Sequence, residues 1–108
     1  MDRIETGDYM EEVIDPQLMI MASEILKAVA HPVRLGIIQA LENGEKNVSE
    51  IQRIVNQPQA VTSQHLNVLR VRGLLKSRRE GNMVYYSIAE PFVLRILKCM
   101  RECFLSHK

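Results

Sequence analysis

The amino-acid sequence predicts a mainly helical α+β domain, with about five helices and a two-stranded β-hairpin. Three observations support this prediction. The chain has 108 residues, the length of one small domain. Apolar residues recur at helical spacing over most of residues 15–72 and again after residue 90. Between these regions, residues 75–88 are rich in branched and aromatic side chains in an alternating pattern, which is typical of β-strands.

The N-terminal 14 residues differ from the rest of the chain. Residues 1–14 are predicted to form an acidic arm or a short extra helix, and residues 15–108 the folded domain. Asp15 and Pro16 mark the start of the first domain helix, because Asp caps free amide groups and Pro is tolerated at the first helical position. The helical pattern continues to about Ala30. The N-terminal sequence resembles no signal peptide and no apolar run is long enough to span a membrane, so we expect a cytoplasmic protein.

Two further helices are expected before residue 56. The first covers about residues 32–42, where apolar residues again recur at helical spacing. The second is shorter and covers about residues 49–55. Ser49 and Gln52 fit a capping box, in which Ser49 accepts from an amide of the first turn while Gln52 reaches back.

The fourth helix is predicted to follow after a tight turn. It starts near Pro58, covers about residues 58–72 and ends at Gly73. Its apolar face is narrow and its other face is polar with a basic end. Two helices joined in this way are typical of a helix-turn-helix.

A β-hairpin and a last helix complete the domain. The strands are predicted at residues 75–79 and 83–88, separated by Glu-Gly-Asn at 80–82, which is hairpin-turn chemistry. The last helix begins near Pro91 and carries two neighbouring apolar stripes. Such a broad apolar face, together with that of the first helix, predicts a dimer interface. The order of elements is that of a winged helix, in which the hairpin at 75–88 is the wing.

Charge is unevenly distributed along the chain. The formal net charge is +1, but residues 1–24 contain seven acidic residues against Arg3. Residues 58–79 contain five basic residues and no acidic one. This basic segment suits a polyanion partner such as DNA, and a solvated basic surface is the alternative.

Three motifs closely resemble the ArsR/SmtB family of bacterial and archaeal winged-helix repressors. They are HPVRLGIIQAL at 31–41, QAVTSQHLNVLRVRGLL at 59–75 and RREGNMVYYSI at 78–88, and the match covers about residues 22–104. The resemblance implies a homodimer that binds a palindromic DNA operator and leaves it when an effector binds. It implies a transcriptional regulator and not an enzyme.

The resemblance also implies which residues contact DNA. On the helix at 58–72 it places five residues at or near DNA: Gln59, Thr62, Ser63, Gln64 and His65. Gln59 and Gln64 are predicted to contact bases, because amide side chains can pair adenine through two hydrogen bonds. Two alternatives stay open: Thr62 faces the core through its methyl group, and His65 packs within the domain. On the wing, Arg78, Arg79 and Asn82 are predicted to reach phosphates or a minor groove.

The effector is predicted to act at the last helix, which holds the two cysteines, Cys99 and Cys103. Residues four apart on a helix have Cβ atoms about 5–6 Å apart, whereas a disulfide needs about 3.5–4.5 Å, so a direct bond requires the helix to unwind. A soft metal or metalloid ion bridges such a gap more easily, and His107 continues the row as a weak third ligand. No other cofactor is predicted.

Several alternatives for the cysteine pair remain open. The pair senses oxidants or sulfur species, binds a soft metal or metalloid, or only packs in an apolar stripe. A small-molecule effector bound elsewhere is a fourth alternative. Two metal-site patterns of the family are absent. The first has cysteines at the start of the helix that precedes the helix at 58–72, where Asn47 and Ser49 lack thiols; the second has an acid and a His at the start of the last helix, where Phe92 cannot bind a metal.

Two other classes of protein are alternatives to a DNA-binding regulator. A winged-helix module that binds protein is disfavoured by the basic segment without acidic residues at 58–79. A thiol enzyme such as a peroxidase is disfavoured because no motif fixes a His or an acid beside either cysteine.

Overall fold

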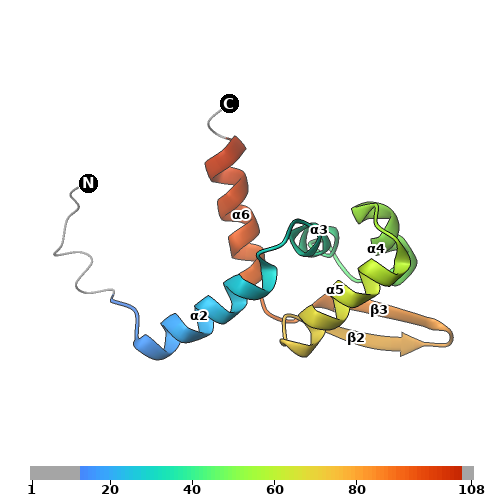
Figure 1. Ribbon diagram of the computed structural model, residues 1–108, viewed down its shortest axis with the longest axis horizontal. Coiled ribbons are helices and arrows are strands. Elements are labelled where there is room, and N and C mark those ends of the chain that lie inside the picture. The colour runs from blue at the N-terminus through green and yellow to red at the C-terminus, as the bar shows by residue number, and fades with distance from the viewer. Residues whose placement is uncertain (1–12, 106–108) are drawn as a thin grey trace.

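The computed structural model describes residues 13–105, and over this range the predicted order of elements is confirmed (Figure 1). Five helices lie within the described residues: α2 (Pro16–Val29), α3 (Pro32–Ala40), α4 (Val48–Val55), α5 (Gln59–Val71) and α6 (Phe92–Leu105). The strands are β1 (Lys46–Asn47), β2 (Leu75–Glu80) and β3 (Met83–Ile88). Residues 1–12 of the predicted arm lie outside the described residues. His107 also lies outside them.

Each of the first two helices begins with a proline that follows a capping side chain. The Asp15 carboxylate accepts a hydrogen bond from the amide of Gln17, as predicted for the start of α2. At the start of α3, His31 Nδ1 accepts from the amide of Val33 at 3.1 Å. These side chains satisfy amide groups that have no partner within the helix.

The predicted cap of α4 is wrong. The helix starts at Val48, and its capping box consists of Asn47 and Glu50 instead of Ser49 and Gln52. The Asn47 side chain accepts from the amide of Glu50 at 2.9 Å, and the Glu50 carboxylate accepts from the amide of Asn47 at 2.9 Å. Because Asn47 belongs to β1, its backbone is extended and suited to the cap position.

The sheet has three strands in the order β1-β3-β2, where the sequence predicted two. The predicted hairpin is confirmed: β2 pairs with β3 from Leu75 opposite Ile88 to Glu80 opposite Met83. Gly81, at φ 63°, is the first residue of the two-residue turn, where a positive φ favours glycine. The additional strand β1 pairs Lys46 and Asn47 with Tyr86 and Tyr85.

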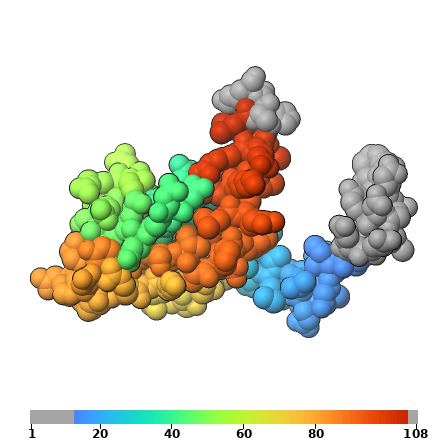
Figure 2. Space-filling model, turned by 180° about the vertical axis from the view of Figure 1, so that it is seen from behind, coloured from blue at the N-terminus to red at the C-terminus, as the bar shows by residue number. Residues whose placement is uncertain are grey.

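The core lies between α3, α4, α5, the base of the sheet and the first half of α6. Its fully buried side chains include Ile37, Ile51, Leu66 and Leu69. By contrast, α2 and α6 extend beyond this compact part and diverge from it (Figures 1 and 2). No helix among the described residues has the length and hydrophobicity needed to cross a bilayer.

Candidate nucleic-acid interface

A tight turn joins α4 to α5 and sets the angle between them. Asn56 closes α4 in the left-handed conformation, at φ 55° and ψ 52°. Pro58 then precedes α5, and no side chain caps the first turn of this helix. The free amide groups at this end therefore favour a phosphate of a nucleic acid. The helix-turn-helix predicted from the sequence is present.

The outward face of α5 carries amide side chains. Gln59 and Gln64 are exposed, as predicted, and Ser63 is half-buried beside them. Asn67 was not predicted, yet it is exposed one turn after Gln64 and accepts a hydrogen bond from Arg70 at 2.7 Å. The three-residue spacing from Gln64 was the signal in the sequence that could have identified it.

The buried face of α5 includes Thr62. Its side chain is fully buried, and its hydroxyl donates to the carbonyl oxygen of Pro58 at 3.0 Å. The prediction that Thr62 contacts DNA is therefore wrong, because Thr62 lies on the same face as Leu66 and Leu69 in the core. The alternative stated for it, a core position, is the one observed.

His65 is held within the domain. Its Nδ1 accepts a hydrogen bond from Arg34 Nε at 3.0 Å, and its ring centroid lies 4.4 Å from that of His31. Arg34 also donates to the carbonyl oxygen of Ala28 at 3.0 Å, so it connects the ends of α2 and α3 to α5. Burial, together with the nearby His31 and Arg34, lowers the pKa of His65. This arrangement favours the packing role over a DNA contact.

The wing carries the predicted basic residues. Arg79 and Asn82 are exposed near the turn of the hairpin. Arg78, in contrast, forms ion pairs with Glu45 and Glu80, each with an N–O distance of 2.9 Å. Its hydrogen bonds to Glu45 and Glu80 raise its pKa, and the hydrogen bond from Arg78 lowers the pKa of Glu45. Arg78 can bind a phosphate only if these carboxylates release it.

The two cysteines lie on α6 as free, exposed thiols. They therefore lie outside the core of the single protomer, on the helix whose apolar surface is predicted to form the dimer interface. Cys99 lies beside an apolar hollow of about 330 Å³, lined mainly by α6 residues and by Leu26 of α2. Within the described residues, no group of three or more His, Cys, Asp or Glu side chains could hold a metal ion.

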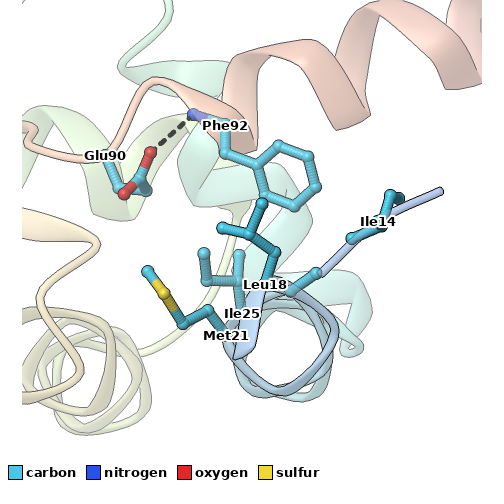
Figure 3. Close-up of a pocket in the computed structure, with 7 residues that line it drawn as sticks. Ile14, Leu18, Met21, Ile25, Glu90 and Phe92 are labelled. Atoms are coloured by element: carbon cyan, nitrogen blue, oxygen red, sulfur yellow. Dashed lines mark hydrogen bonds between the residues drawn. The ribbon is translucent and has the colours of Figure 1, made fainter. Parts of the chain in front are cut away.

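A second apolar hollow, of about 320 Å³, lies between α2 and the start of α6 (Figure 3). Leu18, Met21 and Ile25 line it from α2, and Phe92 faces them from α6. The Glu90 carboxylate accepts a hydrogen bond from the Phe92 amide at 3.0 Å at its rim. Large apolar side chains thus lie open to solvent along both helices, as the predicted interface requires.

Comparisons with known proteins agree with this geometry. The model of the arsR family of bacterial regulatory proteins matches residues 31–77. An uncharacterized HTH-type transcriptional regulator of Methanocaldococcus jannaschii is 40% identical over 82 residues, which cover 75% of this chain and 92% of that protein. Transcriptional repressor PagR of Bacillus anthracis is 42% identical over 79 residues, which cover 72% of this chain and 79% of that protein.

A solved structure extends the agreement to the fold. The homodimeric winged helix-turn-helix DNA-binding domain Mb0332 of Mycobacterium bovis has a TM-score of 0.71 at 30% identity, and the match covers 85% of this chain and 88% of that domain. Relatives and fold are those of transcriptional regulators, not of enzymes, so the thiol-enzyme alternative is set aside. The chain belongs to the ArsR family of bacterial regulatory proteins and is a DNA-binding transcriptional repressor.

Proposed function

We propose that this repressor acts in the cytoplasm as a homodimer on a palindromic operator and leaves the operator when an effector acts at α6. The observation that carries the proposal is the outward face of α5. Gln59, Gln64 and Asn67 are exposed there, on a helix whose first turn has no side-chain cap. Amide side chains read adenine in the major groove, and free amide groups bind phosphate.

The dimer is supported by the apolar surface of α2 and α6. Leu18, Met19, Ile20 and Met21 are each more than half exposed on α2, and Phe104 is 67% exposed on α6. Apolar side chains in such number favour a protein partner over solvent. The structurally similar Mb0332 domain is described as homodimeric. A twofold-symmetric dimer carries two copies of α5, which suits two half-sites of a palindrome.

The proposed location of the effector rests on Cys99 and Cys103. Both thiols are exposed on α6, and Cys99 borders the hollow shared with Leu26 of α2. A change at these thiols would act on the surface that joins the two protomers. It would thereby alter the distance between the two copies of α5, on which operator binding depends.

Sequence-specific DNA binding is tested first by selecting duplexes from a random library with the purified chain. The selected duplex is then titrated in mobility-shift assays at two salt concentrations. We expect a twofold-symmetric consensus and weaker binding at higher salt. Gln64→Ala should relax the selected sequence, whereas Gln39→Ala, an exposed amide on α3, should not. Failure to select any duplex, or binding that is insensitive to salt, would contradict the proposal.

The dimer is tested by sedimentation velocity. Leu26→Glu places a charge on the outward surface of α2, where Leu26 is 47% exposed, and should shift the protein to monomer. Ile54→Glu is the matched control, because Ile54 is 52% exposed on α4, away from α2 and α6. A monomeric parent would contradict the proposed dimer.

The effector is tested by operator release. As(III), Cd(II), Zn(II), peroxide and a polysulfide are added to the protein–DNA complex, and the series is repeated with Cys99→Ser and Cys103→Ser. A compound that acts through the thiols should release the parent and fail to release at least one variant. If both variants respond like the parent to every active compound, the thiols are not the sensor.

A further inference from the structure

One arginine of the wing spans all three strands of the sheet. Arg78 extends from β2 across Tyr85 of β3, with its guanidinium carbon 4.7 Å from the ring centroid. Its Nε and Nη2 then donate to the two carboxylate oxygens of Glu45, each at 2.9 Å. Glu45 directly precedes β1, so this contact joins residues 33 positions apart.

The same guanidinium is held on its own strand as well. Nη1 donates to a carboxylate oxygen of Glu80 at 2.9 Å. Arg78 therefore faces two carboxylates and an aromatic ring at once, and only the planar fork of an arginine can make this set of contacts. The two neighbouring carboxylates carry more negative charge than the guanidinium carries positive charge. This excess weakens the attraction of Arg78 for a phosphate.

The pairing of the strands shows which way each arginine of β2 faces. Successive side chains of a strand point to opposite faces of the sheet. Leu75 is buried in the core together with Leu66 and Leu69 of α5. Arg79 shares the face of Leu75, which is the side on which α5 packs, and Arg78 lies on the other face with Tyr85.

We propose that Arg78 positions the wing for DNA binding without itself binding phosphate, and that Arg79, on the α5 side of the sheet, makes the phosphate contact. Arg78 ties the hairpin to the segment before β1, and Asn47 in β1 caps α4. The wing is thereby oriented relative to the helix-turn-helix. This inference rests on DNA binding by the chain and assigns different roles to two adjacent arginines.

The test uses the duplex selected by the parent protein and measures Kd over a range of salt concentrations. Arg79→Gln should lower the slope of log Kd against log salt by about 2, the loss of one phosphate contact in each protomer of the dimer, and Arg78→Gln should leave the slope unchanged. Arg79→Lys keeps a point charge and should bind like the parent. Arg78→Lys cannot keep the forked contacts and should weaken binding by about fivefold.

Glu45→Gln separates the two roles most directly. If Arg78 orients the wing, removing the Glu45 charge weakens binding and leaves the salt slope unchanged. If Arg78 binds phosphate and Glu45 only competes for it, the same change tightens binding and steepens the slope. Tighter binding by Glu45→Gln, or parent-like binding by Arg78→Lys, would overturn the inference.

A second measurement does not depend on affinity. The Nε–H signal of Arg78 in NMR spectra should stay protected from exchange, with little change in shift, when the duplex is added, because Glu45 keeps accepting from it. The Arg79 signal should shift. A shift at Arg78 without one at Arg79 would overturn the inference, while a parent that selects no duplex would contradict DNA binding itself.

Discussion

Glu42 and Arg101 form a two-point ion pair that joins the segment after α3 to α6. Arg101 Nη1 donates to Glu42 Oε2 at 2.7 Å, and Nη2 donates to Oε1 at 2.5 Å. Arg101 follows Val93 and Leu97 at four-residue spacing, so it continues the buried stripe of α6 where the core ends. The pair thus holds the outer half of α6, the part that carries both cysteines, against the rest of the domain.

This ion pair should make stability depend on acidity. The hydrogen bond from Arg101 lowers the pKa of Glu42 below its ordinary 4.5. Its stabilising effect is therefore fully present above pH 4.5 and is lost as the pH falls through the folded-state pKa. Glu42→Gln should lower the urea midpoint at neutral pH, and the difference from the parent should shrink in acid.

A double-mutant cycle supplies the control for this pair. Arg101→Lys loses the forked geometry and should be destabilising in the parent but nearly neutral in the Glu42→Gln background. Additive effects of the two changes, or a parent–variant difference that stays constant with pH, would show that the pair does not stabilise the position of α6.

His65 should make stability fall at mildly acidic pH. Its Nδ1 must stay unprotonated to accept from Arg34, and its pKa lies below the ordinary 6.5. The unfolded chain therefore binds a proton more readily than the folded one. The stability that unprotonated His65 contributes to the folded state is fully present above pH 6.5. It is lost as the pH falls from there through the folded-state pKa. The groups that face His65 are His31 and Arg34.

His65→Asn is the informative variant, because an amide oxygen can accept from Arg34 and does not titrate in this range. Urea unfolding of parent and variant is compared between neutral and mildly acidic pH. We expect the parent to lose more stability than the variant as the pH falls. Parallel pH profiles would contradict the role given to Nδ1.

The cap of α4 can be tested at two neighbouring residues. Asn47→Ala removes the acceptor for the Glu50 amide and should cost about 1 kcal/mol in the free energy of unfolding. Ser49→Ala is the matched control, because Ser49 is exposed one residue inside the helix, and it should change stability by less than about 0.5 kcal/mol. Urea denaturation measures the free energy of unfolding of both variants. A larger loss for Ser49→Ala than for Asn47→Ala would identify Ser49 as the cap.

The capping residue of α4 could not be predicted from the local sequence. Asn47 and Ser49 are both good capping residues, and each is followed three positions later by a residue that can complete a capping box. The choice between them depends on pairing of β1 with Tyr85 and Tyr86, nearly forty residues away in the chain. Local spacing predicted the helix but could not show that pairing.

The same limit applies to the charged contacts. The helices and the hairpin could be predicted from hydrophobic periodicity and turn residues, because these signals involve residues that are close together in the sequence. The contacts of Arg34 with His65 and of Arg78 with Glu45 join residues 31 and 33 positions apart, and the Arg101–Glu42 pair joins residues 59 apart. Arg78 was therefore predicted as a free basic residue, and Arg34 was not identified.

Thr62 gives a direct test of which face of α5 meets DNA. Its hydroxyl is fully buried and donates to the Pro58 carbonyl, which also accepts from the Thr62 amide at 2.9 Å. Thr62→Val keeps the shape and leaves that carbonyl with its backbone donor, so it should change the unfolding free energy by less than about 1 kcal/mol. Thr62→Ser removes a buried methyl group and should cost about 1 kcal/mol.

DNA binding distinguishes a core residue from a contact residue. Thr62→Val should bind the selected duplex like the parent, because no group that faces DNA has changed. Gln64→Ala, on the exposed face of the same helix, should lose one base contact in each half-site, each worth about 1–3 kcal/mol in mobility-shift titrations. If Thr62→Val weakened binding as much as Gln64→Ala while unfolding at the parent's urea concentration, α5 would have to turn on binding DNA and bring the face now buried in the core toward the groove.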